Sequence, residues 1–171
     1  MQQQALQDPL TGLNNRRFLD QTLPRELARA KRECYAVSFI LLDLDHFKVV
    51  NDTFGHAFGD VVLMKVSEIL KKNSRESDIV CRFGGEEFLM VMPHMTPPQA
   101  DCRANAIRQL IEDTAIEHEG ATLKITISAG VASYPEHGKQ ADVLIKLADD
   151  ALYVAKEDGR NKVKIAALPE A

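Results

Sequence analysis

Two pairs of carboxylates stand where strand-like segments end or begin. Asp43 and Asp45 close the apolar segment 35–45, and Glu86 and Glu87 follow two glycines in the stretch RFGGEEFLMV. Side chains two residues apart lie on one face of a strand, so Asp43 and Asp45 are expected to point the same way. Buried strands rarely end in paired carboxylates unless a cation neutralises them. If the two segments are neighbouring strands, the pairs meet and form an oxygen-rich site suited to Mg²⁺ or Mn²⁺.

A metal site of this kind would serve one type of reaction, and a calcium-binding loop is the competing interpretation of the same residues. Two divalent ions about 4 Å apart are the usual arrangement for in-line attack at a phosphorus atom. A calcium-binding loop is the rival interpretation of DLDHFKVVND, but its fifth position carries no acid or amide and its sixth no glycine. Solvated strand ends remain the alternative for Asp43 and Asp45 taken alone. The second acidic pair, the adjacent glycines and Lys48 favour a site for metal and phosphate.

Length and composition are those of one globular domain. The chain has 171 residues, of which 45% are hydrophobic and 27% are charged. Its net charge of −4 argues against binding to nucleic acid or to an anionic membrane, since both need a basic surface. The sequence contains neither an apolar run of roughly 20 residues nor the pattern of a signal peptide. Three cysteines without CxxC spacing fit reduced thiols, so we expect a cytoplasmic domain.

Helices and strands are expected to alternate along the chain and to position these residues. Apolar spacing predicts helices over about residues 14–33, 61–72, 96–115 and 140–159, with Pro24 a point where the first bends or breaks. Strands are expected at 35–45, in a hairpin over 79–92, at 122–134 and at 161–166, whereas 51–60 is turn-rich. Gly84 and Gly85 predict the hairpin turn, because glycine takes positive φ without steric cost. The pattern indicates an α+β fold whose sheet contains antiparallel pairs.

Five motifs, in order along the chain, resemble one protein family. RFGGEEF matches the form, with glutamate in place of aspartate, of the signature that names the GGDEF diguanylate cyclases. DPLTGLNNRRF resembles the family's opening motif, and DLDHFKVVNDTFGHAFGD its first strand and the loop that follows. ISAGVASYP and ADDALYVAKEDGRNKV resemble its late strand and closing helix. The resemblance covers nearly the whole chain, and five motifs in the correct order are far more specific than any one of them.

The resemblance implies an activity, a fold and an assembly. Enzymes of this family act in bacterial signal transduction and condense two GTP molecules into cyclic di-GMP with release of pyrophosphate. Their fold resembles the palm of polymerases and nucleotidyl cyclases, a mixed and mainly antiparallel sheet flanked by helices. Two Mg²⁺ or Mn²⁺ ions are implied in each active site. A homodimer is also implied, because one chain carries one set of motifs and each 3′-hydroxyl must attack the α-phosphate in the opposite site.

The acidic residues and a lysine receive catalytic roles from the resemblance. Asp43 and Glu86 would bind the metal ions with help from the backbone carbonyl of Leu44, and Glu87 would be a further metal ligand or a supporting acid. Glu86 would also be the general base, although a carboxylate that binds two cations should have a lowered pKa and be a poor base. Lys48 would neutralise charge that develops on the reacting phosphates.

Other residues would bind the substrate. Asn51 and Asp60 would recognise guanine, since a carboxylate accepts hydrogen bonds from the N1–H and the exocyclic amine. Gly84 and Gly85 would let the backbone pass close to the nucleotide. Taken without the resemblance, Asn51 and Asp60 are loop and helix-capping residues.

Two cations near the C-terminus would complete the substrate site. Lys156 and Arg160, one helical turn apart, would bind the β- and γ-phosphates. Without the resemblance they are ordinary cations near a helix C-terminus. His46 and His56 are expected in loops or packing, and Phe47 and Phe88 in the core.

A second site is indicated upstream of the hairpin. Arg75 and Asp78 form an RxxD pattern, and Gly84 follows Arg75 by nine residues. Taken alone, RESD is a solvated turn, but its position matches the family's inhibitory site, at which cyclic di-GMP binds. Arginine can fork onto a guanine edge or a phosphate. Arg103 and Arg108 are candidates for a further arginine of this site.

Domain organisation and two rival functions complete the expectations. We expect residues 1–171 to form a single catalytic domain, with residues 1–7 left from a linker helix and a sensory or receiver domain upstream in the parent protein. A receptor for GTP or cyclic di-GMP on the same fold is one rival, but degenerate members of that kind lose the acidic signature. Another palm-like nucleotidyl cyclase or transferase is the second, and Asn51, Asp60 and the RxxD pattern argue against it.

Overall fold

A five-stranded sheet forms the centre of the computed structural model, which describes residues 5–170. The strands are β1 (Val37–Leu44), β2 (Ile79–Arg82), β3 (Glu87–Pro93), β6 (Ile127–Tyr134) and β7 (Val163–Ile165). They lie in the order β2-β3-β1-β6-β7, and every neighbouring pair is antiparallel except β6 and β7, which are parallel. The expected mixed, mainly antiparallel α+β fold is confirmed.

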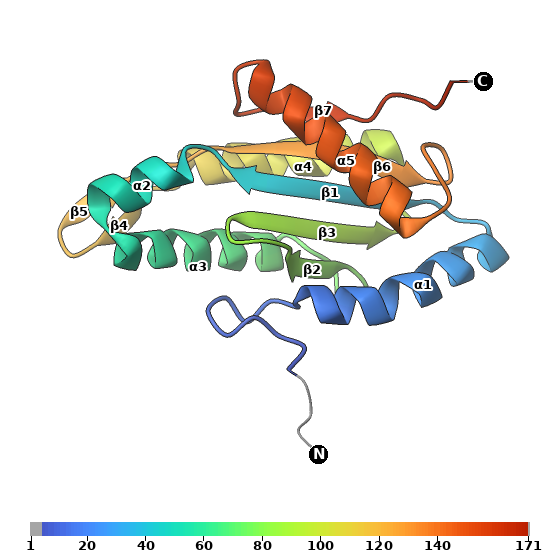
Figure 1. Cartoon of the computed structure of the whole chain (residues 1–171), viewed down its shortest axis with the longest axis horizontal. Helices are drawn as coiled ribbons and strands as arrows, with labels where there is room; N and C mark the ends of the chain where they lie inside the picture. Colours follow the sequence, from blue (N-terminus) through green and yellow to red (C-terminus); the bar gives the residue numbers. More distant parts are fainter. Residues whose placement is uncertain (1–4, 171) are drawn as a thin grey trace.

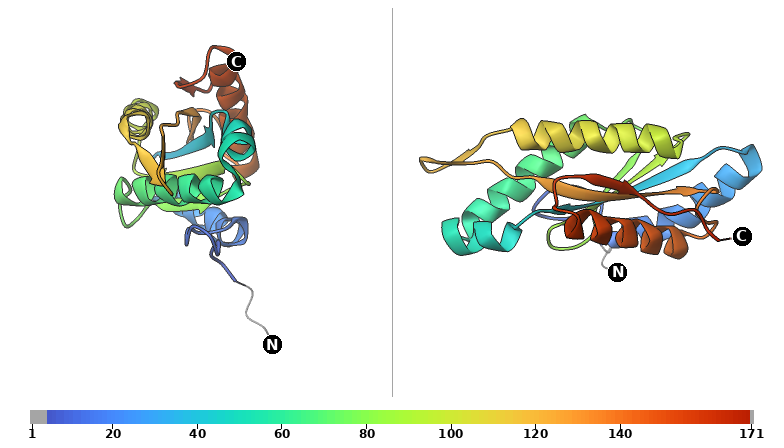
Figure 2. Two further views of the ribbon diagram at one scale, coloured as in Figure 1. Left: turned by 90° about the vertical axis from the view of Figure 1, so that its left-hand side faces the viewer. Right: turned by 90° about the horizontal axis from the view of Figure 1, so that it is seen from above.

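Helices cover both faces of this sheet (Figures 1 and 2). One face carries α3 (His56–Lys72) and α4 (Pro97–Asp113), and the other carries α1 (Arg16–Glu33) and α5 (Ala141–Glu157). The expected helix near the N-terminus therefore forms, and it runs through Pro24 as one helix.

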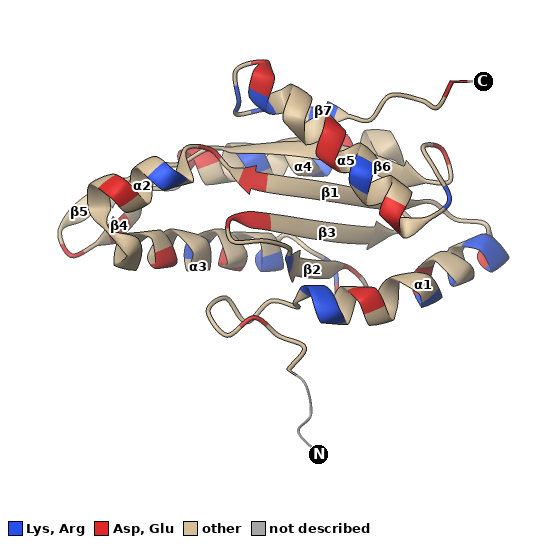
Figure 3. Cartoon of the chain, in the orientation of Figure 1, with Lys and Arg blue, Asp and Glu red and all other residues tan. Residues whose placement is uncertain are grey.

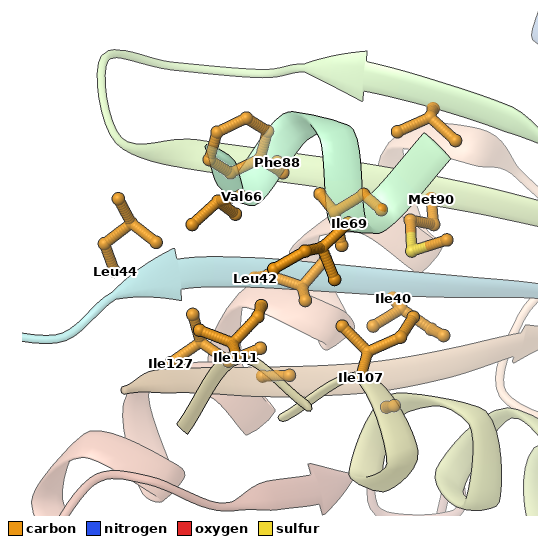
Figure 4. Close-up of a cluster of buried hydrophobic side chains, with 14 of the residues drawn as sticks. Ile40, Leu42, Leu44, Val66, Ile69, Phe88, Met90, Ile107, Ile111 and Ile127 are labelled. Atoms are coloured by element: carbon orange, nitrogen blue, oxygen red, sulfur yellow. The ribbon is translucent and has the colours of Figure 1, made fainter. Parts of the chain in front are cut away.

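The central strand β1 supplies side chains to both hydrophobic cores. Ile40, Leu42 and Leu44 point toward α3 and α4, where they meet residues such as Val66 and Ile107 (Figure 4). The alternate residues Phe39 and Leu41 join the second core, with α1 and α5. Because both faces are covered, every residue of β1 is buried. The doubly covered strand expected from the sequence is therefore present.

The segment after β1 differs from the prediction. Residues 51–60 are helical on both sides of Gly55: 51–54 belong to a short helix α2 (Phe47–Phe54), and 56–60 begin α3, which starts at His56 and not at residue 61. Gly55, with φ of 89°, separates the two helices. Glycines and an Asn-Asp-Thr sequence are typical of turns, which is why a turn was predicted. Burial of Phe47 and Val50 against the sheet holds α2 in place instead.

The predicted strand 122–134 is also divided. Its first part is β5 (Ala121–Leu123), which pairs with β4 (Ile116–His118) in a separate two-stranded sheet, and β6 begins only at Ile127. Both parts have the composition of a strand, and the change of partner between them depends on tertiary contacts that periodicity does not report.

Helix α5 lies close against β6 at one glycine. A Cβ atom on Gly130 would be 2.0 Å from the carbonyl oxygen of Ala148 and 2.5 Å from the backbone nitrogen of Leu152. Any larger residue would push the helix away from the sheet. This approach sets the height of the C-terminal half of α5, which carries Lys156, above the end of β1. Within residues 5–170 no helix has the length and apolar character needed to cross a membrane.

Candidate functional site

The register of the sheet brings the two acidic clusters together. β1 and β3 pair antiparallel with Asp43 opposite Glu87, and the backbone nitrogen of Leu44 donates to the carbonyl oxygen of Glu86 at 3.2 Å. Figure 3 shows the acidic residues side by side where β1 ends and β3 begins. Asp43 is two residues after Leu41 in β1, so the two side chains lie on the same face of the sheet, the one covered by α1 and α5. The sequence predicted that these clusters would meet if the strands were neighbours, and this is confirmed.

The hairpin that carries the glutamates closes through Glu87. The backbone nitrogens of Phe83 and Gly84 donate to the Glu87 carbonyl oxygen, at 2.8 and 3.2 Å. The predicted reason for the two glycines is wrong, because neither has a left-handed φ. A Cβ atom on Gly84 would lie 3.0 Å from Oε2 of Glu87, whereas one on Gly85 would meet open space. Gly84 therefore leaves room for the Glu87 side chain.

Burial raises the pKa of all three carboxyl groups at this edge. For Asp43 removal from water is the largest cause, and Lys156 opposes it. For Glu86 and Glu87 removal from water is again the largest cause, followed by the charge of Asp43. The charge of Lys156 lowers the pKa of Glu86 and of Glu87, but it offsets only part of the rise. Three carboxylates with this little compensation form a site that favours cations.

One oxygen atom marks where the compensation is missing. Nζ of Lys156 lies 2.9 Å from Oδ2 of Asp43, whose side chain is 7% exposed. The other oxygen, Oδ1, is buried and has no hydrogen-bond partner in the described residues. As they stand, residues 5–170 contain no group of three or more acidic, histidine or cysteine side chains close enough to enclose an ion. An ion at this edge would therefore also need oxygens from a ligand or from water, as Mg²⁺ commonly does.

Asp45 differs from the expectation that it shares the site of Asp43. It is 3% exposed, and both of its oxygens are already occupied. Oδ1 accepts a hydrogen bond from Oγ of Ser128 at 2.7 Å, and Oδ2 accepts from Oγ1 of Thr126 at 2.7 Å and from the backbone nitrogen of Asn161 at 3.0 Å. A carboxylate with three donors has no need of a metal ion.

A pocket of ≈ 520 Å³ opens beside the acidic edge. Seven of the predicted site residues line it, namely Asp43, Lys48, Asn51, Asp60, Gly85, Glu86 and Glu87. Four residues that line it were not predicted as site residues: Phe47, His56, Leu63 and Arg82. Leu44, Gly84, Lys156 and Arg160 are not among its lining residues. The pocket is polar at its acidic end and apolar where Phe47 and Leu63 lie, as a nucleotide site requires.

The predicted guanine-binding residues come from two helices. Asn51 lies in α2 and Asp60 in the first turns of α3, and Lys48 lies in the first turn of α2 and not in a loop. The helices meet at Gly59, where a Cβ atom would be only 1.9 Å from Oδ1 of Asn51. Glycine at this position is what allows Asn51 to lie beside Asp60.

Arg82 was not predicted as a site residue, although it is the first residue of the stretch RFGGEEF. Its guanidinium donates from Nη2 to the Gly85 carbonyl oxygen at 2.7 Å and from Nη1 to Asp8 at 3.2 Å. It therefore joins the signature turn to the opening motif. The only sequence signal was its position beside the glycines, since the contact with Asp8 spans 74 residues.

The two C-terminal cations do not share a helix. Lys156 lies in the last turn of α5, which ends at Glu157, while Arg160 lies in the following loop with a left-handed φ of 63°. The premise that the two face one way because they are one helical turn apart is wrong, since Gly159 ends the helical path between them. Lys156 contacts Asp43, and Arg160 is exposed.

The RxxD residues precede the edge strand β2 and line a different pocket, of ≈ 330 Å³. Nη2 of Arg75 lies 3.0 Å from Oδ1 of Asp78 and donates to the Pro93 carbonyl oxygen at 2.6 Å. Lys71 and Ser74 also line this pocket, together with Gln7 and three residues of the opening motif: Gly12, Leu13 and Asn14.

Neither candidate for a further arginine lines that pocket. Arg103 donates to the Asn73 carbonyl oxygen at 2.7 Å and so supports the turn before Arg75. Arg108 donates to Glu112 and Asn161. Arg108, in α4, therefore contacts the loop between α5 and β7 and not the RxxD pocket.

Comparison with known proteins agrees with this geometry. Residues 5–162 match the family model described as diguanylate cyclase, GGDEF domain. The diguanylate cyclase DgcP of Pseudomonas aeruginosa is 39% identical over 164 residues, which cover 96% of this chain and 24% of that protein.

Two solved structures extend the comparison to the fold. The GGDEF domain of DgcB from Caulobacter crescentus, in complex with c-di-GMP, has a TM-score of 0.90 at 32% identity and covers 96% of this chain and 95% of its own. The active GGEEF domain of a Vibrio cholerae diguanylate cyclase has a TM-score of 0.78 at 32% identity, covering 85% and 92%.

The curated relatives are longer than this chain, which spans 24% to 36% of the first ones it matches. What these comparisons establish is therefore the family of the domain. The family model covers nearly all of the chain, the solved GGDEF domains share its fold, and the signature lies where the acidic edge forms. The chain belongs to the GGDEF-domain family of diguanylate cyclases.

Proposed function

We propose that this domain is a diguanylate cyclase, which joins two GTP molecules into cyclic di-GMP and releases pyrophosphate. One observation carries the proposal: a single pocket is lined by the acidic edge, by Lys48, and by the two residues suited to guanine, Asn51 and Asp60. The structures of relatives named as diguanylate cyclases support it, and one of these has the same GGEEF signature and is described as active.

Base recognition is assigned to Asn51 and Asp60. Asp60 accepts hydrogen bonds from the guanine N1–H and exocyclic amine, and Asn51 pairs with another edge of the base. Adenine lacks the donor pair, so ATP would leave the Asp60 carboxylate without partners in the pocket. Phe47 and Leu63 supply the apolar surface on which a base can lie.

The acidic edge fits divalent cations. Asp43, Glu86, Glu87 and the Leu44 carbonyl oxygen would hold one or two Mg²⁺ or Mn²⁺ ions, which supply Lewis-acid stabilisation of the phosphates. Support comes from the unpartnered Oδ1 of Asp43 and from the raised pKa values of the surrounding carboxyl groups. Glu86 is assigned the role of general base, which accepts the proton of the attacking 3′-hydroxyl, because it lines the pocket at the tip of the hairpin.

Three cations are assigned to the triphosphate. Lys48 lines the pocket and neutralises charge near the α-phosphate, and Lys156 and Arg160 bind the β- and γ-phosphates. Lys156 can do so by leaving Asp43, which it contacts at 2.9 Å. Exchange of one anionic partner for another requires only a change of rotamers in a long, partly exposed side chain.

Two copies of the domain are required. One chain carries one pocket of this kind among its described residues, and the product contains two joined guanylates, so each 3′-hydroxyl attacks a phosphate bound to the other copy. Arg75 and Asp78 are assigned to a second site at which the product arrests the enzyme. In a longer parent protein, an upstream sensory or receiver domain would control the pairing of the copies.

Incubation with GTP and Mg²⁺ at several protein concentrations tests the proposal, with the nucleotides separated by chromatography. Cyclic di-GMP should form, and its rate should rise faster than linearly with protein concentration because catalysis needs two copies. If GTP stays unchanged even when a dimerising fusion is attached, the domain is a receptor and not an enzyme.

A further inference from the structure

One buried carboxylate, Asp45, is hydrogen-bonded to the loop that carries Arg160, a cation assigned to the triphosphate. Asp45 follows Asp43, the residue at the acidic edge, by two positions, and one of its three donors is the backbone nitrogen of Asn161 at 3.0 Å. Asn161 directly follows Arg160. A single hydrogen bond therefore links the end of β1 to the loop that carries Arg160, across 116 residues of sequence.

The loop after α5 needs such a contact to keep its shape. Three successive residues have positive φ: Gly159 at 104°, Arg160 at 63° and Asn161 at 47°. For the two residues other than glycine, the left-handed region costs about 1–2 kcal/mol each. Backbone of this kind persists where surrounding contacts hold it.

The side chain of Asn161 supplies the remaining contacts. Its Oδ1 accepts a hydrogen bond from Nη1 of Arg108 at 3.0 Å, and its Nδ2 donates to Oε2 of Glu112 at 3.0 Å. Arg108 and Glu112 are themselves paired at 3.1 Å on α4. Asn161 is thus bound through its backbone to Asp45, the residue directly after β1, and through its side chain to α4, while the neighbouring Arg160 is exposed.

We propose that Asp45 and Asn161 are positioning residues, which hold the α5–β7 loop so that Arg160 reaches the triphosphate of a GTP bound at the acidic edge. The inference rests on the proposed function, in which Arg160 binds the β- and γ-phosphates. Neither residue touches the substrate. They fix the separation between the α-phosphate end of the site, at Asp43, and its terminal-phosphate end, at Arg160.

The chemistry of the donors around Asp45 predicts which substitutions matter. The hydroxyl groups of Thr126 and Ser128 can donate or accept, but the Asn161 nitrogen can only donate. Asn in place of Asp45 keeps an oxygen at the Oδ2 position for Thr126 and Asn161, and turns its amide toward Ser128, which then accepts. Asp45→Asn therefore preserves the link, whereas Asp45→Ala removes it. A metal-binding aspartate would respond differently, since the amide loses the charge that the ion needs.

The test compares a triphosphate with a monophosphate, using 3′-deoxy-GTP, which lacks the attacking hydroxyl, and GMP. Dissociation constants with Mg²⁺ are measured by calorimetry for the unaltered domain, Asp45→Ala, Asp45→Asn and Asn161→Gly. Glycine tolerates the left-handed φ, so Asn161→Gly removes the contacts to α4 without straining the backbone. Melting temperatures confirm that each variant is folded.

Asp45→Ala and Asn161→Gly should each weaken binding of 3′-deoxy-GTP by about tenfold, the loss of one charge-assisted contact, and leave GMP binding unchanged. Asp45→Asn should bind both nucleotides like the unaltered domain. In an Arg160→Ala background, Asn161→Gly should have little further effect, because it acts through Arg160.

Other results overturn the inference. An equal loss of affinity for both nucleotides would mean a merely structural role, and an unchanged affinity for 3′-deoxy-GTP would mean that the loop needs no such support. A loss in Asp45→Asn as large as that in Asp45→Ala would indicate a metal ligand. Failure of the assigned GTP site gives a distinct result, since the unaltered domain would then bind neither nucleotide, and the inference falls with it; a domain that binds 3′-deoxy-GTP but forms no cyclic di-GMP fails the proposed function and leaves the positioning role intact.

Discussion

Lys156 reaches from the last turn of α5 to Asp43 at the end of β1, with 2.9 Å between Nζ and Oδ2. The pair joins a residue assigned to the terminal phosphates with a residue assigned to the metal ions. The lysine side chain is 28% exposed and the aspartate side chain 7%, so the pair is largely shielded from water. This contact is the main compensation for the burial of Asp43.

Removal of Lys156 should destabilise the domain as well as weaken GTP binding. Lys156→Met leaves Asp43 a buried carboxylate without a counter-charge, which costs about 1–3 kcal/mol at this partly open site and lowers the melting temperature by several degrees. Differential scanning calorimetry measures the shift. Lys146→Met is the matched control, because Lys146 pairs with Asp150 on an exposed face of the same helix and should change little. Adding Asp43→Asn to Lys156→Met should restore most of the lost stability; no restoration would mean that the lysine acts through packing alone.

The glutamates of the signature should be required for turnover and costly for stability. Glu86→Gln and Glu87→Gln remove charge without changing shape, and each should reduce cyclic di-GMP synthesis by at least about 100-fold. Burial raises the pKa of both groups, so the folded state holds their protons more tightly than the unfolded chain does. Stability from this source therefore falls as pH rises through the raised pKa values.

The melting temperature tests that sign. Near neutral pH and without divalent ions, Glu87→Gln should melt above the unaltered domain, and the difference should vanish as the pH falls below the ordinary glutamate pKa of 4.5. Addition of Mn²⁺ should raise the melting temperature of the unaltered domain more than that of the variant. The exposed Glu117→Gln serves as the control and should melt like the unaltered domain. A variant that melts lower at neutral pH would contradict the account of Glu87.

Gly59 should be necessary for guanine recognition although it makes no contact with the base. In Gly59→Ala, the new Cβ atom would lie 1.9 Å from Oδ1 of Asn51, so Asn51 must move. We expect KM for GTP to rise roughly tenfold, the loss of about one buried hydrogen bond, with a smaller effect on kcat. In an Asn51→Ala background the same substitution should have a smaller further effect on KM, because the Asn51 amide is gone and only Cζ of Phe47, 3.2 Å from the new Cβ atom, remains close. Additive losses would show that Gly59 acts through something other than Asn51.

Arg75 should be required for product inhibition and dispensable for turnover. Arg75→Ala removes the forked donor that lies beside the ≈ 330 Å³ pocket, so cyclic di-GMP should no longer slow the reaction while the initial rate stays the same. Arg75→Lys keeps the charge but loses the fork, and should restore only part of the inhibition. Progress curves with and without added cyclic di-GMP measure both effects. Inhibition that survives in Arg75→Ala would place the product elsewhere.

Parts of this fold could be predicted because their signals are local. The apolar residues of β1 occupy both alternating faces, which is typical of a strand covered on both sides, and all of them are buried. The hairpin of the signature was also predicted, but not for the right reason: Gly84 accommodates Glu87 and has no left-handed φ. Helix α2 was missed because the local sequence resembles a turn, while burial of Phe47 and Val50 decides its conformation.

By itself, the sequence determined the chemistry available to this protein. Residue types and the order of five motifs identify the family, the acidic edge and the residues suited to a nucleotide, because these depend on short stretches of chain. The tertiary structure decided which contacts each of those residues makes, and so which role it can have. Asp43 and Asp45 are two positions apart, yet one contacts Lys156 while the other is saturated by Thr126, Ser128 and Asn161. The contacts to Ser128 and Asn161 span 83 and 116 residues. Periodicity describes one helix or strand at a time, so it cannot report contacts that arise only when separate elements pack.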